Sequence, residues 1–153
     1  FRGAGPLSDG EQLHATSVEI EGTGVLIRGA PGSGKSDLAL RLIDGGARLV
    51  ADDRVDVVAE NGRLILSAPP AIAGLMEVRG LGILRLEAVA AVPLGLIVEL
   101  VAPGEIERLA QATTRRLLGA DVPCLELAPF EASAPAKLRL ALAVARGEIE
   151  RVE

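Results

Sequence analysis

Apolar residues along this chain gather in short runs, many of them alternating with polar residues, which is the pattern of β-strands. In chain order, the predicted strands cover residues 14–20, 25–28, 48–51, 55–59, 63–67 and 94–101. Two connections carry turn sequences, Glu21-Gly22-Thr23-Gly24 and Asn61-Gly62, in which glycine permits the tight turn of a hairpin. A further short strand is predicted between residues 121 and 130. We therefore expect a fold rich in short strands.

Three segments instead repeat their apolar residues at the spacing of an α-helix. They cover residues 36–44, 105–118 and about 136–151. The first directly follows a Gly-rich loop and is closed by Gly45-Gly46, a C-terminal stop signal. A strand, a loop and a helix in succession predict an α/β fold.

The composition indicates one domain with an aliphatic core. The chain has 153 residues, of which 49% are hydrophobic, and its only aromatic residues are Phe1 and Phe130. This length is usual for a single domain that buries a continuous core. We expect that domain to cover residues 13–153, because residues 1–12 are rich in Gly, Pro and Ser and read as a flexible lead or a cut end.

Charge and composition also argue against several classes of function. A formal net charge of -5 and the scarcity of aromatic residues disfavour nucleic-acid binding. The longest apolar run, residues 88–98, falls short of the ~20 residues that cross a bilayer, so no membrane partner is expected. The single cysteine, Cys124, excludes an internal disulfide, and one histidine disfavours a zinc cluster. These features fit a cytoplasmic protein.

The strongest chemical signal is the Gly-rich loop between the second predicted strand and the first helix. Its sequence, Gly29-Ala30-Pro31-Gly32-Ser33-Gly34-Lys35-Ser36, fits the Walker A pattern at every fixed position. In such a loop the backbone N–H groups surround phosphate oxygens, the lysine reaches the β- and γ-phosphates, and the serine hydroxyl binds Mg²⁺. The alternative, a Gly-rich loop with a chance lysine, is disfavoured by the flanking strand and helix. The loop predicts nucleotide binding.

Two adjacent carboxylates, Asp52 and Asp53, follow the strand at residues 48–51. We expect this strand to lie beside the strand that leads into the Walker A loop. Ligands of open α/β sheets lie at the carboxyl ends of the strands, so the two carboxylates would stand near the γ-phosphate. One could bind the metal while the other accepts a proton from an attacking hydroxyl. The alternative is an exposed acidic turn that pairs with Arg54.

Three further residues are weaker candidates on their own. Glu77 and Arg79 alternate with apolar residues and are followed by two glycines, which is also the pattern of a half-exposed strand. His14 stands at the start of a predicted strand, where a lone histidine is more often an ordinary surface residue than a catalyst.

Taken together, four of these segments resemble one family in order and spacing. They are His14, the loop from Gly29 to Ser36, Arg48-Leu49-Val50-Ala51-Asp52-Asp53-Arg54-Val55-Asp56 and Met76-Glu77-Val78-Arg79-Gly80-Leu81-Gly82-Ile83. Together they resemble HPr kinase/phosphorylase, the bacterial enzyme that phosphorylates a serine on a small phosphocarrier protein. The resemblance extends to the last predicted helix. It implies a P-loop fold of the HPr kinase / PEP carboxykinase-like type, a mixed sheet with flanking helices.

The resemblance also implies roles for the matched residues. Lys35 and the loop amides would hold ATP, and Ser36 and Glu77 would bind Mg²⁺. Asp53 would accept the proton of the substrate serine, and would return it in the reverse reaction, when phosphate attacks phosphoserine. The substrate would be an HPr-like phosphocarrier.

The remaining catalytic candidates also come from the resemblance. Asp52 and His14 match supporting positions of the active site, and Arg79 lies in one of the matched segments. Arg108, in Ile106-Glu107-Arg108-Leu109, resembles an arginine that stabilises the charge developing on the phosphoryl group.

The chain departs from the family pattern in two places. Family members usually carry an N-terminal domain that this sequence lacks, so the resemblance is to the short forms. The segment Ser133-Ala134-Pro135-Ala136-Lys137-Leu138-Arg139-Leu140-Ala141 matches a segment associated with dephosphorylation but lacks its Gly-Arg-Asn core, which argues against phosphorylase activity. Family enzymes commonly form hexamers, so a homo-oligomer is expected.

Two other functions stay open on the residues alone. The same loop and carboxylates suit a kinase of small molecules, although the Arg-rich lid segment usual in such enzymes is not found. A regulatory module that binds a nucleotide without transferring phosphate would also carry the loop. Transfer of labelled phosphate separates these alternatives.

Overall fold

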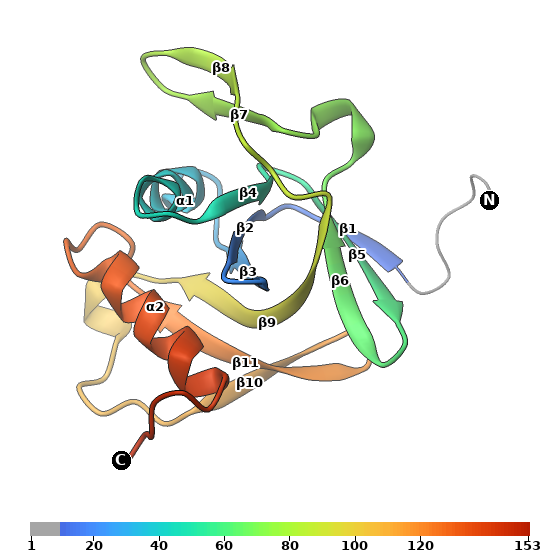
Figure 1. Ribbon diagram of the computed structural model, residues 1–153. Helices are drawn as coiled ribbons and strands as arrows, with labels where there is room; N and C mark the ends of the chain where they lie inside the picture. Colours follow the sequence, from blue (N-terminus) through green and yellow to red (C-terminus); the bar gives the residue numbers. More distant parts are fainter. Residues whose placement is uncertain (1–9) are drawn as a thin grey trace.

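The structure, a computed structural model, describes residues 10–153 (Figure 1). Its strands are β1 (Gly10–Leu13), β2 (Thr16–Ile20), β3 (Thr23–Arg28), β4 (Arg48–Ala51), β5 (Val55–Glu60), β6 (Arg63–Ser67), β7 (Leu75–Val78), β8 (Gly82–Arg85), β9 (Ala91–Leu100), β10 (Thr113–Leu117) and β11 (Ala120–Leu127). Its helices are α1 (Lys35–Asp44) and α2 (Ala134–Ala145), with short 3-10 helices η1 (Pro70–Ile72) and η2 (Pro103–Glu105).

Nine of these strands form one mixed sheet. Its order is β1-β5-β6-β9-β3-β2-β4, with β11 added beside β9 and β10 beside β11. Strand β9 runs parallel to both β3 and β11. Because β2 is antiparallel to β3 and also to β4, β4 points in the same direction as β3. The carboxyl ends of β3, β4, β9 and β11 therefore meet at one edge of the sheet, which is the usual position of a ligand crevice.

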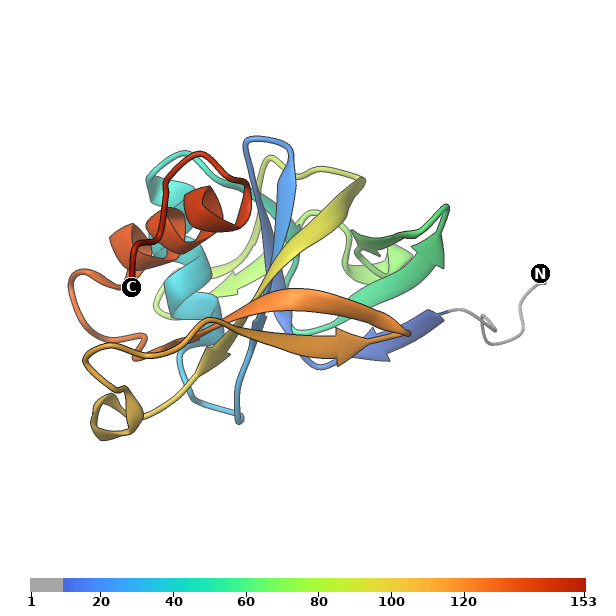
Figure 2. The same ribbon diagram turned by 90° about the horizontal axis from the view of Figure 1, so that it is seen from below.

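The two helices cover one face of this sheet (Figures 1 and 2). Successive residues of a strand point to opposite faces, and β3 follows this rule. Val25 and Ile27 pack with Leu38 of α1 and Leu138 of α2. Leu26, between them, packs into a second apolar cluster on the other face. The central strand is thus buried on both sides, and this fixes the position of the loop that follows it.

Strands β7 and β8 form a separate two-stranded sheet, which projects from the body beyond α1 (Figure 1). Met76 of β7 is buried and packs into the cluster that contains α1. Leu81 and Ile83, near the tip, are 73% and 70% exposed. The hairpin is therefore anchored through its first strand, whereas its tip lies in solvent.

The α/β fold with a mixed sheet and flanking helices is confirmed, as are helix α1 and the β5–β6 hairpin. The turn of that hairpin has positive φ at Asn61 and Gly62, 51° and 78°, which suits the twist of the paired strands. Among residues 10–153, no helix is both long and apolar enough to cross a membrane.

The prediction of a helix over residues 105–118 is wrong. Only η2 is helical there, and Thr113–Leu117 is β10, which pairs antiparallel with β11. Two neighbouring β-branched threonines favour a strand. A turn with positive φ at Leu118 and Gly119, 46° and 81°, then returns the chain along β11. Pairing across this turn outweighed the helical spacing of the apolar residues before it.

Four other predictions need correction. Helix α2 ends at Ala145 rather than near residue 151, and Gly147 follows with a φ of 78°. The strand expected to start at His14 starts at Thr16, and Gly10–Leu13 is β1, so residues 10–12 are not a flexible lead. The rest of that lead, residues 1–9, lies outside the described residues. Finally, β4 is not adjacent to β3, because β2 lies between them.

Candidate active site

The Walker A loop connects β3 to α1 at the ligand edge of the sheet. Gly32 and Gly34 have φ of 77° and 104°, in the left-handed region that glycine adopts without strain. A Cβ on Gly29 would stand 2.4 Å from the hydroxyl oxygen of Ser33, so the turn also requires glycine at its start. The first N–H groups of α1 have no partners within the helix and carry its positive dipole end. This loop can therefore bind phosphate through backbone amides.

Lys35 is the first residue of α1, and its side chain folds back over the loop. Its ammonium group donates hydrogen bonds to the carbonyl oxygens of Gly29, at 2.9 Å, and Ala30, at 3.1 Å. An ammonium group has three donors, so one remains for a phosphate oxygen. The two carbonyls thus hold the positive charge at the mouth of the loop.

Asp52, at the end of β4, is joined to the loop by hydrogen bonds. The Ser36 hydroxyl donates to Asp52 Oδ1 at 2.6 Å, and the Thr16 hydroxyl donates to the same oxygen at 3.2 Å. Asp52 is only 8% exposed. Although β2 separates β4 from β3, the shared direction of the two strands brings this carboxylate to the serine of the loop. Thr16 of the intervening β2 was not singled out from the sequence, because it belongs to no motif.

Asp53, the next residue, lies outside this group of side-chain hydrogen bonds. It is exposed and has a φ of 74°, which is rare for a residue with a side chain. Its carbonyl accepts a hydrogen bond from the N–H of Ala15 at 3.2 Å, and its own N–H donates to the Thr16 hydroxyl at 3.5 Å. The backbone between β4 and β5 is thus tied to β2. The strained turn separates a buried Asp52 from an accessible Asp53.

The hydrogen bond between Ala15 and Asp53 also brings the backbone of His14 close to Asp53. It occupies the bend between β1 and β2, directly before the residue that hydrogen-bonds to Asp53, and it is exposed. The structure therefore groups five predicted site residues at one edge. They are His14, Lys35, Ser36, Asp52 and Asp53.

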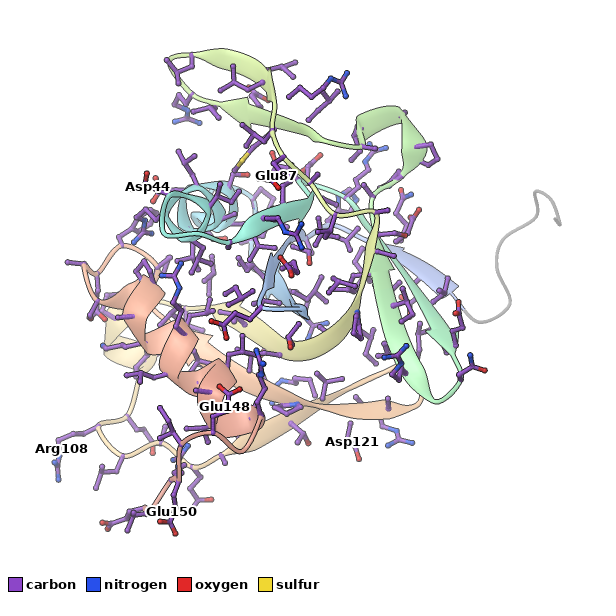
Figure 3. All side chains as sticks on the ribbon, viewed as in Figure 1. Asp44, Glu87, Arg108, Asp121, Glu148 and Glu150 are labelled. Carbon is purple, nitrogen blue, oxygen red and sulfur yellow. The ribbon has the colours of Figure 1, made fainter. Side chains whose placement is uncertain are left out.

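The other three candidates are not joined to this group. Glu77 is exposed on β7, on the face opposite the buried Met76, and Arg79 is exposed in the following turn. Arg108 is exposed in the loop between η2 and β10, and Figure 3 shows it at the outer end of that loop. Within residues 10–153, no side-chain hydrogen bond or ion pair links any of the three to the Walker A loop.

A half-buried ion-pair cluster supports the strand that leads into the loop. Glu99 of β9 pairs with Arg28 of β3 at 2.8 Å and with Arg115 of β10 at 3.0 Å. Burial, together with the nearby Glu99, raises the pKa of the Cys124 thiol to about 11. At neutral pH this thiol is protonated and is a poor nucleophile. We therefore do not include Cys124 among the candidate catalytic groups.

The oxygen atoms beside the loop fit a divalent cation such as Mg²⁺. Ser36 and Asp52 supply a hydroxyl and a carboxylate, the donors that hold Mg²⁺ in P-loop proteins. Within residues 10–153 no group of three or more His, Cys, Asp or Glu residues could hold a metal by itself. In kinase sites Mg²⁺ is usually bound through one or two protein groups together with substrate phosphates.

The geometry agrees with what comparison with known proteins shows. The family model of the HPr serine kinase C-terminal domain matches residues 6–138. The chain belongs to this family. In structure, it is similar to the HPr(Ser) kinase/phosphatase from Coxiella burnetii, with a TM-score of 0.80 and 30% identity, over 92% of this chain and 99% of that one.

Curated relatives match this chain over a shorter stretch than the family model does. HPr kinase/phosphorylase from Clostridium tetani is 52% identical over 73 residues, which are 48% of this chain and 24% of the relative. The protein of the same name from Lacticaseibacillus casei is 48% identical over 79 residues, 51% of this chain and 25% of the relative. The matched stretch thus spans about a quarter of the length of these relatives.

Proposed function

We propose that this domain is an ATP- and Mg²⁺-dependent protein-serine kinase whose acceptor is an HPr-like phosphocarrier. One observation carries the proposal most strongly: the hydrogen bond of 2.6 Å between Ser36 of the Walker A loop and Asp52 at the tip of β4. It joins the phosphate loop to the acidic turn, and the accessible Asp53 follows directly. The names of the family and of its relatives support the choice of acceptor.

The residues divide the work of phosphoryl transfer. The loop amides and Lys35 hold the triphosphate, and Ser36 and Asp52 orient the metal. Bound Mg²⁺ would supply positive charge that offsets the charge of the phosphate oxygens. Glu77, which the family resemblance gives as a metal ligand, would have to approach from the β7–β8 hairpin.

Asp53 is proposed as the base. The oxygen of the substrate serine forms a bond to the γ-phosphorus while the bond from that phosphorus to the bridging oxygen breaks. The electron pair stays on the departing ADP, and the serine proton passes to a carboxylate oxygen of Asp53. Because Asp53 is exposed, a serine on the surface of another protein can reach it. His14, which precedes the residue that hydrogen-bonds to the Asp53 backbone, would position this carboxylate. Arg79 would act from the turn between β7 and β8, and Arg108 from the loop between η2 and β10.

Transfer of labelled phosphate tests the proposal. The protein is incubated with γ-labelled ATP, Mg²⁺ and a cognate HPr, beside an HPr in which the acceptor serine is alanine. We expect an acid-stable phosphate on serine in the first reaction and none in the second. Binding of ATP without transfer would instead indicate a regulatory nucleotide sensor, and transfer to a metabolite alone would indicate a small-molecule kinase.

A further inference from the structure

A hollow adjoins the Walker A loop, on the side away from Asp52. Its volume is about 630 Å³. The segments after β9 and β11 form most of its wall, and Ala30 and Ser33 of the loop close one side. In the sheet, β9 and β11 lie on one side of β3, whereas β2 and β4 lie on the other. The hollow and the acidic turn thus flank the loop on opposite sides.

The lining of this hollow is mainly apolar. Its apolar side chains include Leu100, Val101, Pro103, Ala128, Pro129 and Phe130. Phe130 is the only aromatic residue in the described part of the chain, and it is 71% exposed. Such exposure of a large aromatic ring at the wall of a hollow is typical of a surface that a ligand covers.

Phe130 is held against the loop. A Cβ on Gly34 would stand 2.8 Å from Cζ of the phenyl ring, so the ring lies over the bare backbone of that glycine. The guanidinium group of Arg41 donates hydrogen bonds to the carbonyls of Pro129 and, at 3.4 Å, Glu131. Since Arg41 belongs to α1, the residues on both sides of Phe130 are fixed to the helix that begins in the loop.

The loop also contributes a polar side chain without a hydrogen-bond partner within residues 10–153, that of Ser33, to the wall of the hollow. The hydroxyl oxygen of Ser33 is buried and has no hydrogen-bond partner among the described residues. Ser33 is one of the residues that line the hollow. A buried hydroxyl without a partner is costly, so a ligand that offers it a hydrogen bond gains affinity.

A bound nucleotide has to extend from the loop in a definite direction. If its terminal phosphate faces Asp52 and Asp53, its nucleoside half leaves the loop on the opposite side. On that side, the segments that follow β9 and β11 enclose the hollow. Its volume lies within the ~300–1,000 Å³ usual for ligand pockets. A flat aromatic base can stack on an aromatic ring without specific hydrogen bonds.

We propose that this hollow receives the base and ribose of the nucleotide, with Phe130 as the surface on which the base stacks. The inference rests on the proposed function, because it requires that the loop bind a nucleoside triphosphate. It assigns binding roles to Phe130 and Ser33, and it fixes the direction in which the nucleotide lies across the sheet edge.

Calorimetric titration with two probes, MgATP and inorganic tripolyphosphate with Mg²⁺, tests the inference. In Phe130→Ala we expect ATP affinity to fall about 5- to 150-fold, the equivalent of one base stack, and tripolyphosphate affinity to stay unchanged. Leu140→Ala is the control, because Leu140 is an exposed apolar residue of α2, 56% exposed, outside the hollow. It should bind both probes as the unchanged protein does.

The other outcomes overturn the inference in distinguishable ways. Unchanged ATP affinity in Phe130→Ala places the base elsewhere, and an equal loss for both probes means that Phe130 only shapes the loop. If the unchanged protein binds neither probe, the proposed function itself is contradicted.

Fluorescence provides a second test that does not remove the ring. The chain has no tryptophan, so Phe130→Trp introduces a single reporter. ATP should change its emission, and tripolyphosphate should not. Identical responses to both probes would contradict stacking of the base at this position.

Discussion

The Walker A loop has two flanks that differ in chemistry. On the β4 side, Thr16, Ser36 and Asp52 form a buried hydrogen-bonded group, and Asp53 is exposed beside it. On the β9 and β11 side the wall is mainly apolar and carries Phe130. The loop between them holds the phosphates, and a bound nucleotide must also take up an orientation relative to the two flanks. The difference between the flanks supplies that orientation, with reacting phosphate on one side and nucleoside on the other.

The largest effect is expected from Asp53→Asn, which removes the proposed base and nothing else from the polar flank. Phosphoryl transfer should fall by about 10²- to 10⁴-fold, the usual contribution of general-base catalysis. ATP affinity should stay the same, because Asp53 is exposed and outside the loop. Single-turnover transfer and calorimetric titration measure the two quantities.

Asp44→Asn is the matched control for this change. Asp44 is exposed and is the last residue of α1, whose first residue belongs to the loop, and its substitution alters the net charge equally. Transfer should be unaffected. A loss as large as that of Asp53→Asn would show that charge alone explains the effect and would remove Asp53 as the base.

A smaller effect is expected from Asp52→Asn, because the amide keeps the shape of the carboxylate but loses its charge. The Mg²⁺ concentration needed for half-maximal transfer should rise about 10- to 100-fold, as when a metal site loses a supporting group. Saturating Mg²⁺ should restore much of the rate, which distinguishes a metal role from a proton-transfer role. A rate loss independent of Mg²⁺ would exchange the roles of the two aspartates.

The smallest effect concerns the strand that carries the polar flank. Arg48, the first residue of β4, donates to both carboxylate oxygens of Glu19 in β2, at 3.0 and 3.2 Å. The hydrogen bonds from Arg48 hold the pKa of Glu19 below its usual value of 4.5. Glu19→Gln should lower the free energy of unfolding by about 1 kcal/mol at neutral pH, the size of a partly exposed ion pair.

The pH dependence of this effect has a definite sign. A lowered folded-state pKa contributes stability that is present above the unfolded-state value of 4.5 and is lost as the pH falls through the folded-state value. The free energies of unfolding of the two proteins, measured with urea, should therefore converge as the pH falls below the folded-state pKa of Glu19. Glu87→Gln is the control, because Glu87 is 79% exposed and 4.0 Å from Arg48. An equal loss in the control would refute the special role of Glu19.

Local sequence signals predicted the loop and its helix well. The positive φ of Gly32 and Gly34 favours glycine at both positions, and Lys35 and Ser36 start a helix whose apolar residues face the sheet. The Asn61-Gly62 turn was equally clear, because its conformation depends on the two residues alone. Such features are decided within a few residues of the chain.

Features that depend on distant segments escaped prediction. The order of strands places β2 between β3 and β4, so Thr16 became a partner of Asp52 without belonging to any motif. The helical spacing before Thr113 was overruled by pairing with β11. The hollow beside Phe130 joins three separate loops, which no sequence window contains.

A crystal structure with a non-hydrolysable ATP analogue and Mg²⁺ tests the orientation most directly. The account predicts the γ-phosphate beside Asp52 and Asp53, the metal against the Ser36 hydroxyl, and the base on the ring of Phe130. A nucleotide lying the other way, with its base over the acidic turn and its γ-phosphate toward β11, would contradict it.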